Sequence, residues 1–217
     1  MRTVLSADIV GSTQLPAALR GQLAETVKAA FTSLKARPKI KYSIGRGDFI
    51  QAELPVKEGL RYLLLLKSYL NRLTESDQEV KQEKVFVDAR ISLAIGAVTL
   101  EASTVGESDG PAYQLSGRAL DEMKSAKQSI SMQCTEPDFN DELYVMAKSL
   151  EFITDKWTKG SAEIVSLLLQ GKKETDISEQ LGISQSAVNQ RKKTAGWDIL
   201  QAMLHRYEKK SVLLKQA

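Results

Sequence analysis

The chain has 217 residues, of which 42% are apolar and 26% are charged, and its formal net charge is +3. This composition is typical of a soluble globular protein with one large domain or two modest ones, and it excludes a disordered or fibrous chain. A single cysteine, Cys134, excludes an intrachain disulfide, and a single histidine, His205, excludes zinc clusters of the usual Cys/His spacing. No apolar run approaches the ~20 residues that cross a bilayer, and the first residues do not form a signal peptide, so we expect a cytoplasmic protein without membrane contact.

Charge is unevenly distributed along the chain. Residues 1–150 hold 19 basic and 19 acidic side chains, whereas residues 185–217 hold 7 basic and 2 acidic ones. A basic end on a neutral body favours a polyanionic partner for that end alone. A solvated helix face would explain the same composition. Choosing between a polyanion-binding end and a solvated face therefore needs a more specific motif.

The first 134 residues alternate between strand and helix patterns. Helical spacing of apolar residues predicts three helices, over 15–34, 56–73 and 111–127. Strand patterns occupy 2–7, 85–100 and 129–134, and glycines at turn positions predict a hairpin over 39–54. The order βαββαβ, followed by a helix and a strand, predicts an α+β fold: a ferredoxin-like, split-βαβ sheet with helices on one face.

A boundary between two domains is predicted near residues 135–140, because the chain beyond them is purely helical in pattern. Helices are expected near 141–156, 161–170, 174–181, 185–196 and 197–210. The sequence therefore predicts an α+β domain over residues 1–137 and an all-α domain over residues 138–217.

Residues 175–193 (TDISEQLGISQSAVNQRKK) carry the most specific local pattern. Ile177 and Leu181 lie one helical turn apart, Gly182 permits a left-handed helix exit, Ser184 can cap the next helix, and Val188 is its buried anchor. The segment resembles the helix-turn-helix of bacterial regulators and of sigma-factor-like domains.

This packing directs a polar and basic face of the second helix outward. Asn and Gln side chains bind base edges, and Lys and Arg side chains bind phosphates or guanine. The predicted DNA-binding residues are Gln185, Ser186, Asn189, Gln190, Arg191, Lys192 and Lys193. The alternative is a helical hairpin that serves dimerisation.

Near the N-terminus, Asp8 ends a strand and is followed by Gly11, Ser12 and Thr13 in a turn that leads into a helix. Backbone amides at such a helix start are suited to phosphates. If the first strand lies beside the hairpin, Asp8 becomes a neighbour of Asp48, and two carboxylates suit Mg²⁺ carried by a nucleotide. Taken singly, Asp8 could be a helix cap and Asp48 a turn residue.

Four segments in order resemble class III nucleotide cyclases: residues 8–13 (DIVGST), Gly47 with Asp48, residues 90–98 (RISLAIGAV) and residues 110–120 (GPAYQLSGRAL). The hairpin also resembles that of GGDEF diguanylate cyclases. The residues that begin the fourth segment (GPAY) and the length of the chain resemble those of SatD-family proteins, which tend to carry a C-terminal helix-turn-helix. The resemblance implies that Asp8 and Asp48 bind metal, that Gln114 and Arg118 bind nucleotide, and that two chains share each site in a homodimer.

The chain departs from the cyclase pattern at several positions. Gln114 occupies the position of an Asn in the cyclase motifs, Ile44 that of a purine-selecting Lys, and Ser92 that of a Gly. The sequence also lacks patterns for the later strands of a cyclase. An alternative hairpin register would place Arg46 opposite the metal site.

The sequence as a whole predicts a DNA-binding transcriptional regulator. Its degenerate cyclase-like domain would mediate dimerisation and sense a nucleotide with Mg²⁺. Two alternatives remain open: an active nucleotidyl cyclase-type enzyme, against which the departures argue, and an interaction protein in which both sites are vestigial.

Overall fold

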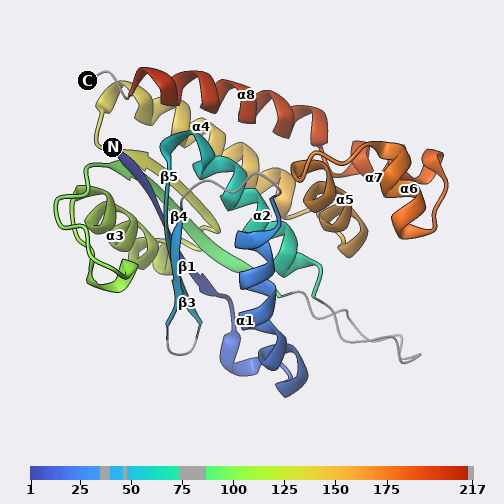
Figure 1. Cartoon of the computed structure of the whole chain (residues 1–217), viewed down its shortest axis with the longest axis horizontal. Helices are drawn as coiled ribbons and strands as arrows, with labels where there is room; N and C mark the ends of the chain where they lie inside the picture. Colours follow the sequence, from blue (N-terminus) through green and yellow to red (C-terminus); the bar gives the residue numbers. More distant parts are fainter. Residues whose placement is uncertain (35–39, 46–47, 74–86, 215–217) are drawn as a thin grey trace.

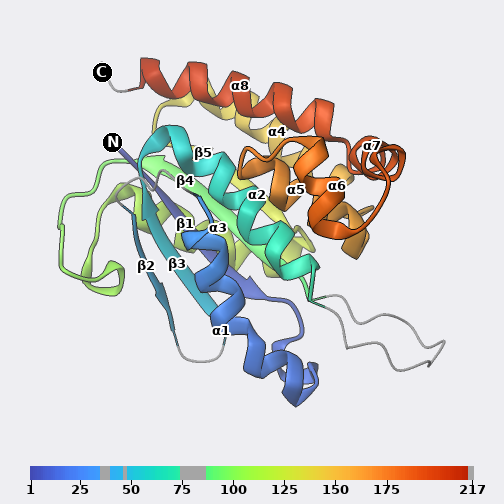
Figure 2. The same cartoon turned by 45° about the vertical axis from the view of Figure 1, so that its right-hand side comes forward.

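The computed structural model describes residues 1–34, 40–45, 48–73 and 87–214, and in this part a single five-stranded sheet forms the centre of the molecule (Figures 1 and 2). Its strands are β1 (Arg2–Ile9), β2 (Lys41–Ile44), β3 (Phe49–Leu54), β4 (Ala89–Gly96) and β5 (Ile130–Cys134). The spatial order is β2-β3-β1-β4-β5, and every pair is antiparallel except β4–β5. The first four strands have the order of a split-βαβ sheet, which confirms the predicted fold class.

Eight α-helices accompany the sheet in the described residues. Those of the N-terminal half are α1 (Ala17–Thr32), α2 (Gly59–Asn71) and α3 (Pro111–Ala126). Those of the C-terminal region are α4 (Pro137–Thr154), α5 (Lys159–Leu169), α6 (Glu174–Leu181), α7 (Gln185–Thr194) and α8 (Trp197–Leu213). Short 3₁₀ turns occupy Ser12–Gln14, Val56–Glu58 and Val105–Glu107. α2 therefore begins three residues later than the apolar pattern predicts, and α4 begins four residues earlier.

The two faces of the sheet are covered by different helices. Alternate residues of a strand point to opposite faces, and Leu5 and Ala7 of β1 belong to the main core with α1 and α2. Val4 packs instead against Tyr113 of α3, and the Ser6 hydroxyl lies 2.9 Å from that of Ser116 on the same helix.

The two crossover helices α1 and α2 thus share one face of the sheet, as expected, whereas α3 lies on the other face, as Figure 1 shows. The physical reason is the connection between β4 and α3. Its 3₁₀ turn packs over β2 and β3, with Val105 against Val4, and this route carries the chain to the other face.

A buried carboxylate fastens α3 to the sheet. Glu53 is only 2% exposed, accepts a hydrogen bond from the Tyr113 hydroxyl at 2.8 Å and pairs with Arg2 Nε at 2.9 Å. Burial, together with the neighbouring Glu53, raises the pKa of Tyr113, so the phenol keeps its proton and remains a donor.

The outer edge of β5 is capped by side chains. The Ile130 N–H donates to Glu151 of α4 at 3.1 Å, and the Ile130 carbonyl accepts from Gln128 at 2.7 Å. At the other end of β5, the Asn140 side chain both accepts from the Cys134 N–H (2.7 Å) and donates to the Cys134 carbonyl (2.9 Å). Satisfying an edge in this way blocks further strand pairing, and it ties α4 to the sheet.

The main hydrophobic core continues across residue 137, where the predicted domain boundary lies. It includes Phe139 and Leu150 of α4 and Tyr207 of α8 together with the strands of the sheet. Tyr207 is fully buried, with its hydroxyl 3.4 Å from the Thr3 hydroxyl of β1. A second cluster joins α5, α6 and α7 through Ile164, Leu167, Ile177 and Val188. Of the helices described after residue 136, only α6 and α7 contribute no residue to that main core.

None of the helices in the described ranges combines the length and the apolar character that crossing a bilayer requires.

Candidate functional site

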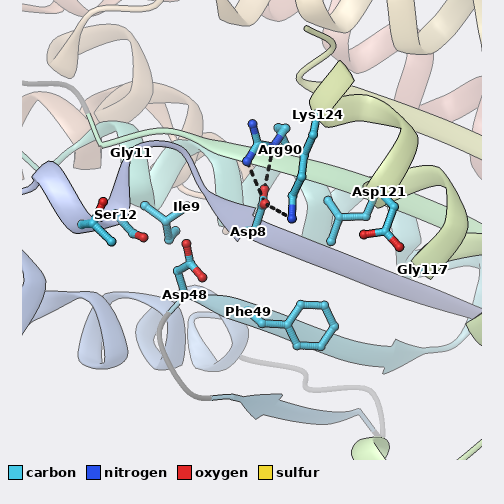
Figure 3. A pocket seen from close by; sticks show the side chains of 12 residues that line it. Asp8, Ile9, Gly11, Ser12, Asp48, Phe49, Arg90, Gly117, Asp121 and Lys124 are labelled. Atoms are coloured by element: carbon cyan, nitrogen blue, oxygen red, sulfur yellow. Dashed lines mark hydrogen bonds and ion pairs between the residues drawn. The ribbon is translucent and has the colours of Figure 1, made fainter. Parts of the chain in front are cut away.

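A pocket of about 520 Å³ opens where β1 ends, between β3, β4 and α3 (Figure 3). Five of the residues predicted from the sequence line it: Asp8, Gly11, Ser12, Thr13 and Asp48. They are joined by side chains that the sequence did not assign to a site, namely Phe49, Arg90, Asp121 and Lys124. The strand-to-helix turn and the hairpin thus meet at one place.

Strand register explains why Asp8 and Asp48 meet. β1 and β3 are antiparallel, and Asp8 lies opposite Phe49, the residue directly after Asp48. On its other side, Asp8 lies opposite Arg90 of β4. This pairing places both aspartates in the lining of one pocket. Arg46 and Gly47, which the alternative register and the cyclase resemblance invoked, lie outside the described residues.

Asp8 is held by two cations. Its Oδ1 accepts from Arg90 Nε and its Oδ2 from Arg90 Nη2, both at 2.8 Å, and Lys124 Nζ lies 3.5 Å from Oδ2. Figure 3 shows all three contacts converging on this carboxylate, whose side chain is 9% exposed. The hydrogen bond to Asp8 raises the pKa of Arg90, and the charge of Asp48 acts in the same direction. A bidentate guanidinium–carboxylate pair of this kind is among the stronger and more directional ion pairs.

This arrangement does not fit a Mg²⁺ ion at Asp8. Magnesium requires carboxylate oxygens at ~2.0–2.1 Å in near-octahedral geometry, and both oxygens of Asp8 are engaged by Arg90. Within the part of the chain that the structure describes, no group of three or more His, Cys, Asp or Glu side chains could hold a metal ion. Asp8 serves here as the partner of Arg90, not as a free metal ligand.

The two residues assigned to nucleotide from the cyclase resemblance lie elsewhere. Gln114 and Arg118 are exposed on α3 and do not line the pocket. The Gln114 side chain lies 3.5 Å from Asp109, and Arg118 Nε donates to the Gln114 carbonyl at 3.3 Å. Within one chain the structure therefore separates this pair from Asp8, and only a second chain could bring such a pair to the pocket.

Sequence reasoning missed Arg90 and Lys124 as pocket residues. Arg90 begins the third cyclase-like segment, and the charge that it adds to an otherwise apolar strand was a usable signal. Lys124 lies on α3 among other exposed charges, and nothing in the local pattern distinguishes it.

The predicted helix-turn-helix segment forms two helices joined by a tight turn. α6 ends at Leu181, and the next residue, Gly182, has a left-handed φ of 61° that a side chain would disfavour. The Ser178 hydroxyl donates to the Ile183 carbonyl at 2.6 Å, and the Ser184 hydroxyl caps α7 by accepting from the Ala187 N–H at 3.1 Å. Val188 is fully buried against α5 and α6.

The outward face of α7 is uncovered, and it carries Gln185, Ser186, Asn189, Gln190 and Lys193. The other two predicted phosphate contacts are partly engaged within the chain. Lys192 Nζ pairs with Glu174 at 2.9 Å, and Arg191 lies 3.8 Å from Glu163. Of the three basic residues, Lys193 has no ion pair within the described ranges.

Comparison with known proteins gives a limited result. No protein-family model matches the chain, and no curated protein does. Among solved structures, a bacterial light-regulated adenylyl cyclase is 16% identical to this chain, with a TM-score of 0.43. The match covers 60% of this chain and 74% of the cyclase chain. A second structure of a bacterial light-regulated adenylyl cyclase is 14% identical, with a TM-score of 0.40. That match covers 60% of this chain and 42% of the cyclase chain. At this level of similarity, the fold rests on the strand order and register of the chain itself.

Proposed function

We propose that the chain is a DNA-binding regulator in which α7 contacts the bases and the pocket beside Asp8 receives a nucleotide that modulates binding. The observation that carries the proposal is the uncovered polar face of α7 on a three-helix unit. The tight turn at Gly182 and the buried Val188 hold that helix in one orientation.

The side chains on this face have the chemistry of base recognition. Asn and Gln can form paired hydrogen bonds with adenine in the major groove, which is wide enough to admit a helix. Gln185 and Asn189 are exposed and lie in the first half of α7, the part of a recognition helix that contacts bases, and the exposed Gln190 directly follows Asn189.

The phosphate contribution is expected to be small. Lys192 and Arg191 are already near Glu174 and Glu163, so their charges are partly offset inside the chain. Binding should therefore have a shallow salt dependence, carried mainly by Lys193.

The pocket has the features of a small-molecule site. It combines an exposed cation, Lys124, with the aromatic ring of Phe49 and the turn formed by Gly11 and Thr13. Phosphates favour cationic side chains, and a base can stack on an aromatic ring. The proposal therefore assigns the phosphates to Lys124, and it does not assign a metal ion to Asp8.

Lys193→Ala should weaken binding to a pool of random-sequence DNA duplexes and lower the salt slope by about 1, because one phosphate contact is lost. Asn189→Ala should instead reduce discrimination among duplexes selected from that pool, by about 1–3 kcal/mol at the contacted position. Fluorescence anisotropy at several salt concentrations measures both quantities.

The matched control is Lys28→Ala, which removes the same charge from α1, outside the helix-turn-helix. Equal weakening by Lys28→Ala and Lys193→Ala would show only a net-charge effect. No binding to any duplex by the parent protein would exclude the DNA-binding function.

A saturating nucleoside triphosphate should raise the free energy of unfolding, by about 2.7 kcal/mol at a hundredfold excess over its dissociation constant. Lys124→Ala should abolish this gain and leave the ligand-free protein nearly unchanged, because the Lys124 side chain is 54% exposed. Thermal unfolding with and without Mg²⁺ measures the response, and Asp48→Asn tests whether any Mg²⁺-dependent part involves that carboxylate.

An unchanged response in Lys124→Ala would place the ligand elsewhere, and no response to any triphosphate would remove the nucleotide from the proposal. Formation of a cyclic nucleotide by the parent protein would instead identify the enzyme that the cyclase resemblance implies.

A further inference from the structure

The outer face of α4 exposes an unusual amount of apolar surface. Tyr144, Val145 and Phe152 are 61%, 62% and 66% exposed, although the opposite face of the same helix is buried in the main core. These three side chains lie on one side of α4 and define an apolar stripe, in which the exposed Lys148 separates Tyr144 and Val145 from Phe152. Exposed apolar side chains gathered on one face mark an interaction site more often than single exposed residues do.

Charged residues flank the apolar stripe with opposite signs at its two ends. Asp141 lies one turn before Val145, and Lys156 lies four residues after Phe152, just beyond the end of α4. Both are exposed, and neither has an ion pair within the described ranges. Lys156 Nζ instead lies 3.3 Å from the centre of the Phe152 ring. The face therefore has an acidic end, a middle in which Lys148 lies among apolar side chains, and a basic end.

Such a face is complementary to itself. If two copies of α4 pack antiparallel about a two-fold axis between Lys148 and Ser149, Asp141 of each copy faces Lys156 of the other. In the same register, Val145 of each copy faces Phe152 of the other. A two-fold interface requires this kind of self-complementarity, and the sequence spacing supplies it in both the charged and the apolar pairs.

We propose that the outer face of α4 binds a second copy of this chain. The neighbouring edge of β5 offers little for strand pairing, because Glu151, Gln128 and Asn140 occupy backbone groups at both of its ends. The contact is therefore made by side chains of one helix pair, which places it at the small and reversible end of specific interfaces. It does not depend on the DNA-binding proposal, although a dimer would carry two copies of α7.

The test measures self-association by sedimentation equilibrium across micromolar concentrations. The parent protein should dimerise, and Phe152→Glu should raise the dissociation constant at least about tenfold, because it places a carboxylate against Val145 of the other copy. Asp141→Lys and Lys156→Asp should each weaken the dimer, because each creates two pairs of like charges across the interface. The double variant Asp141→Lys/Lys156→Asp should restore it, because the signs are complementary again.

Leu100→Glu is the matched control, because Leu100 is 57% exposed on the connection between β4 and α3. It should leave the dimer intact, and circular dichroism should show that every variant is folded. A monomeric parent, or a dimer broken by Leu100→Glu and not by Phe152→Glu, would overturn the proposal. So would a double variant no better than the two single ones.

Discussion

Asp88→Ala is expected to destabilise the protein by about 3 kcal/mol, because it strands a buried cation. Lys67 of α2 is fully buried, and its Nζ lies 2.7 Å from Asp88, directly before β4. Its other hydrogen bond is to the Ala89 carbonyl at 3.4 Å. Without Asp88 the ammonium group would remain in the core with that long hydrogen bond and the more distant charge of Asp155.

The reverse substitution should be far milder. Lys67→Met removes the buried charge at similar volume, and Asp88 keeps hydrogen bonds from Asn71 and from the Ala89 N–H. Its side chain is also 34% exposed, so water can solvate it. We expect Lys67→Met to change stability by less than about 1 kcal/mol and to relieve most of the Asp88→Ala loss in the double variant. Urea unfolding of the four proteins measures this cycle, and equal losses for the two single variants would contradict a stranded charge.

Tyr207→Ala is expected to lower the free energy of unfolding by about 3–5 kcal/mol, since it empties a fully buried aromatic site. The ring packs against Phe139 of α4, and the hydroxyl lies beside Thr3 and Gly59. The substitution should therefore destabilise the sheet as well as the helices. Tyr207→Phe should have a smaller effect of about 1 kcal/mol, because it removes only the hydroxyl and its long contact with Thr3.

Two probes test whether sheet and helices unfold together. Fluorescence of Trp157 and Trp197 reports on the C-terminal helical region, and far-ultraviolet circular dichroism reports on the whole chain. Both should follow one transition in the parent protein and in Tyr207→Ala. Two separate transitions, with Tyr207→Ala shifting only one of them, would favour independent domains divided near residue 137.

Local patterns in the sequence determined much of this protein. Apolar spacing and turn residues predict the strands and helices close to their observed positions, because these signals act between residues a few positions apart. The turn at Gly182 and the cap at Ser184 were predictable for the same reason. The order βαββαβ also led to the strand order, and through it to the proximity of Asp8 and Asp48, because few sheet topologies accommodate that order.

Only the tertiary structure decided the electrostatic partners and the extent of the core. Arg90 reaches Asp8 across 82 residues of sequence through the register of β1 and β4, and Lys124 reaches it from α3. The sequence assigned Lys192 to DNA phosphates, but packing of α6 places Glu174 beside it. The helical pattern after residue 137 also did not reveal that Tyr207 would complete the core of the sheet. Each of these contacts joins segments distant in sequence, so its existence depends on strand register and helix packing, which residue patterns along one segment do not encode.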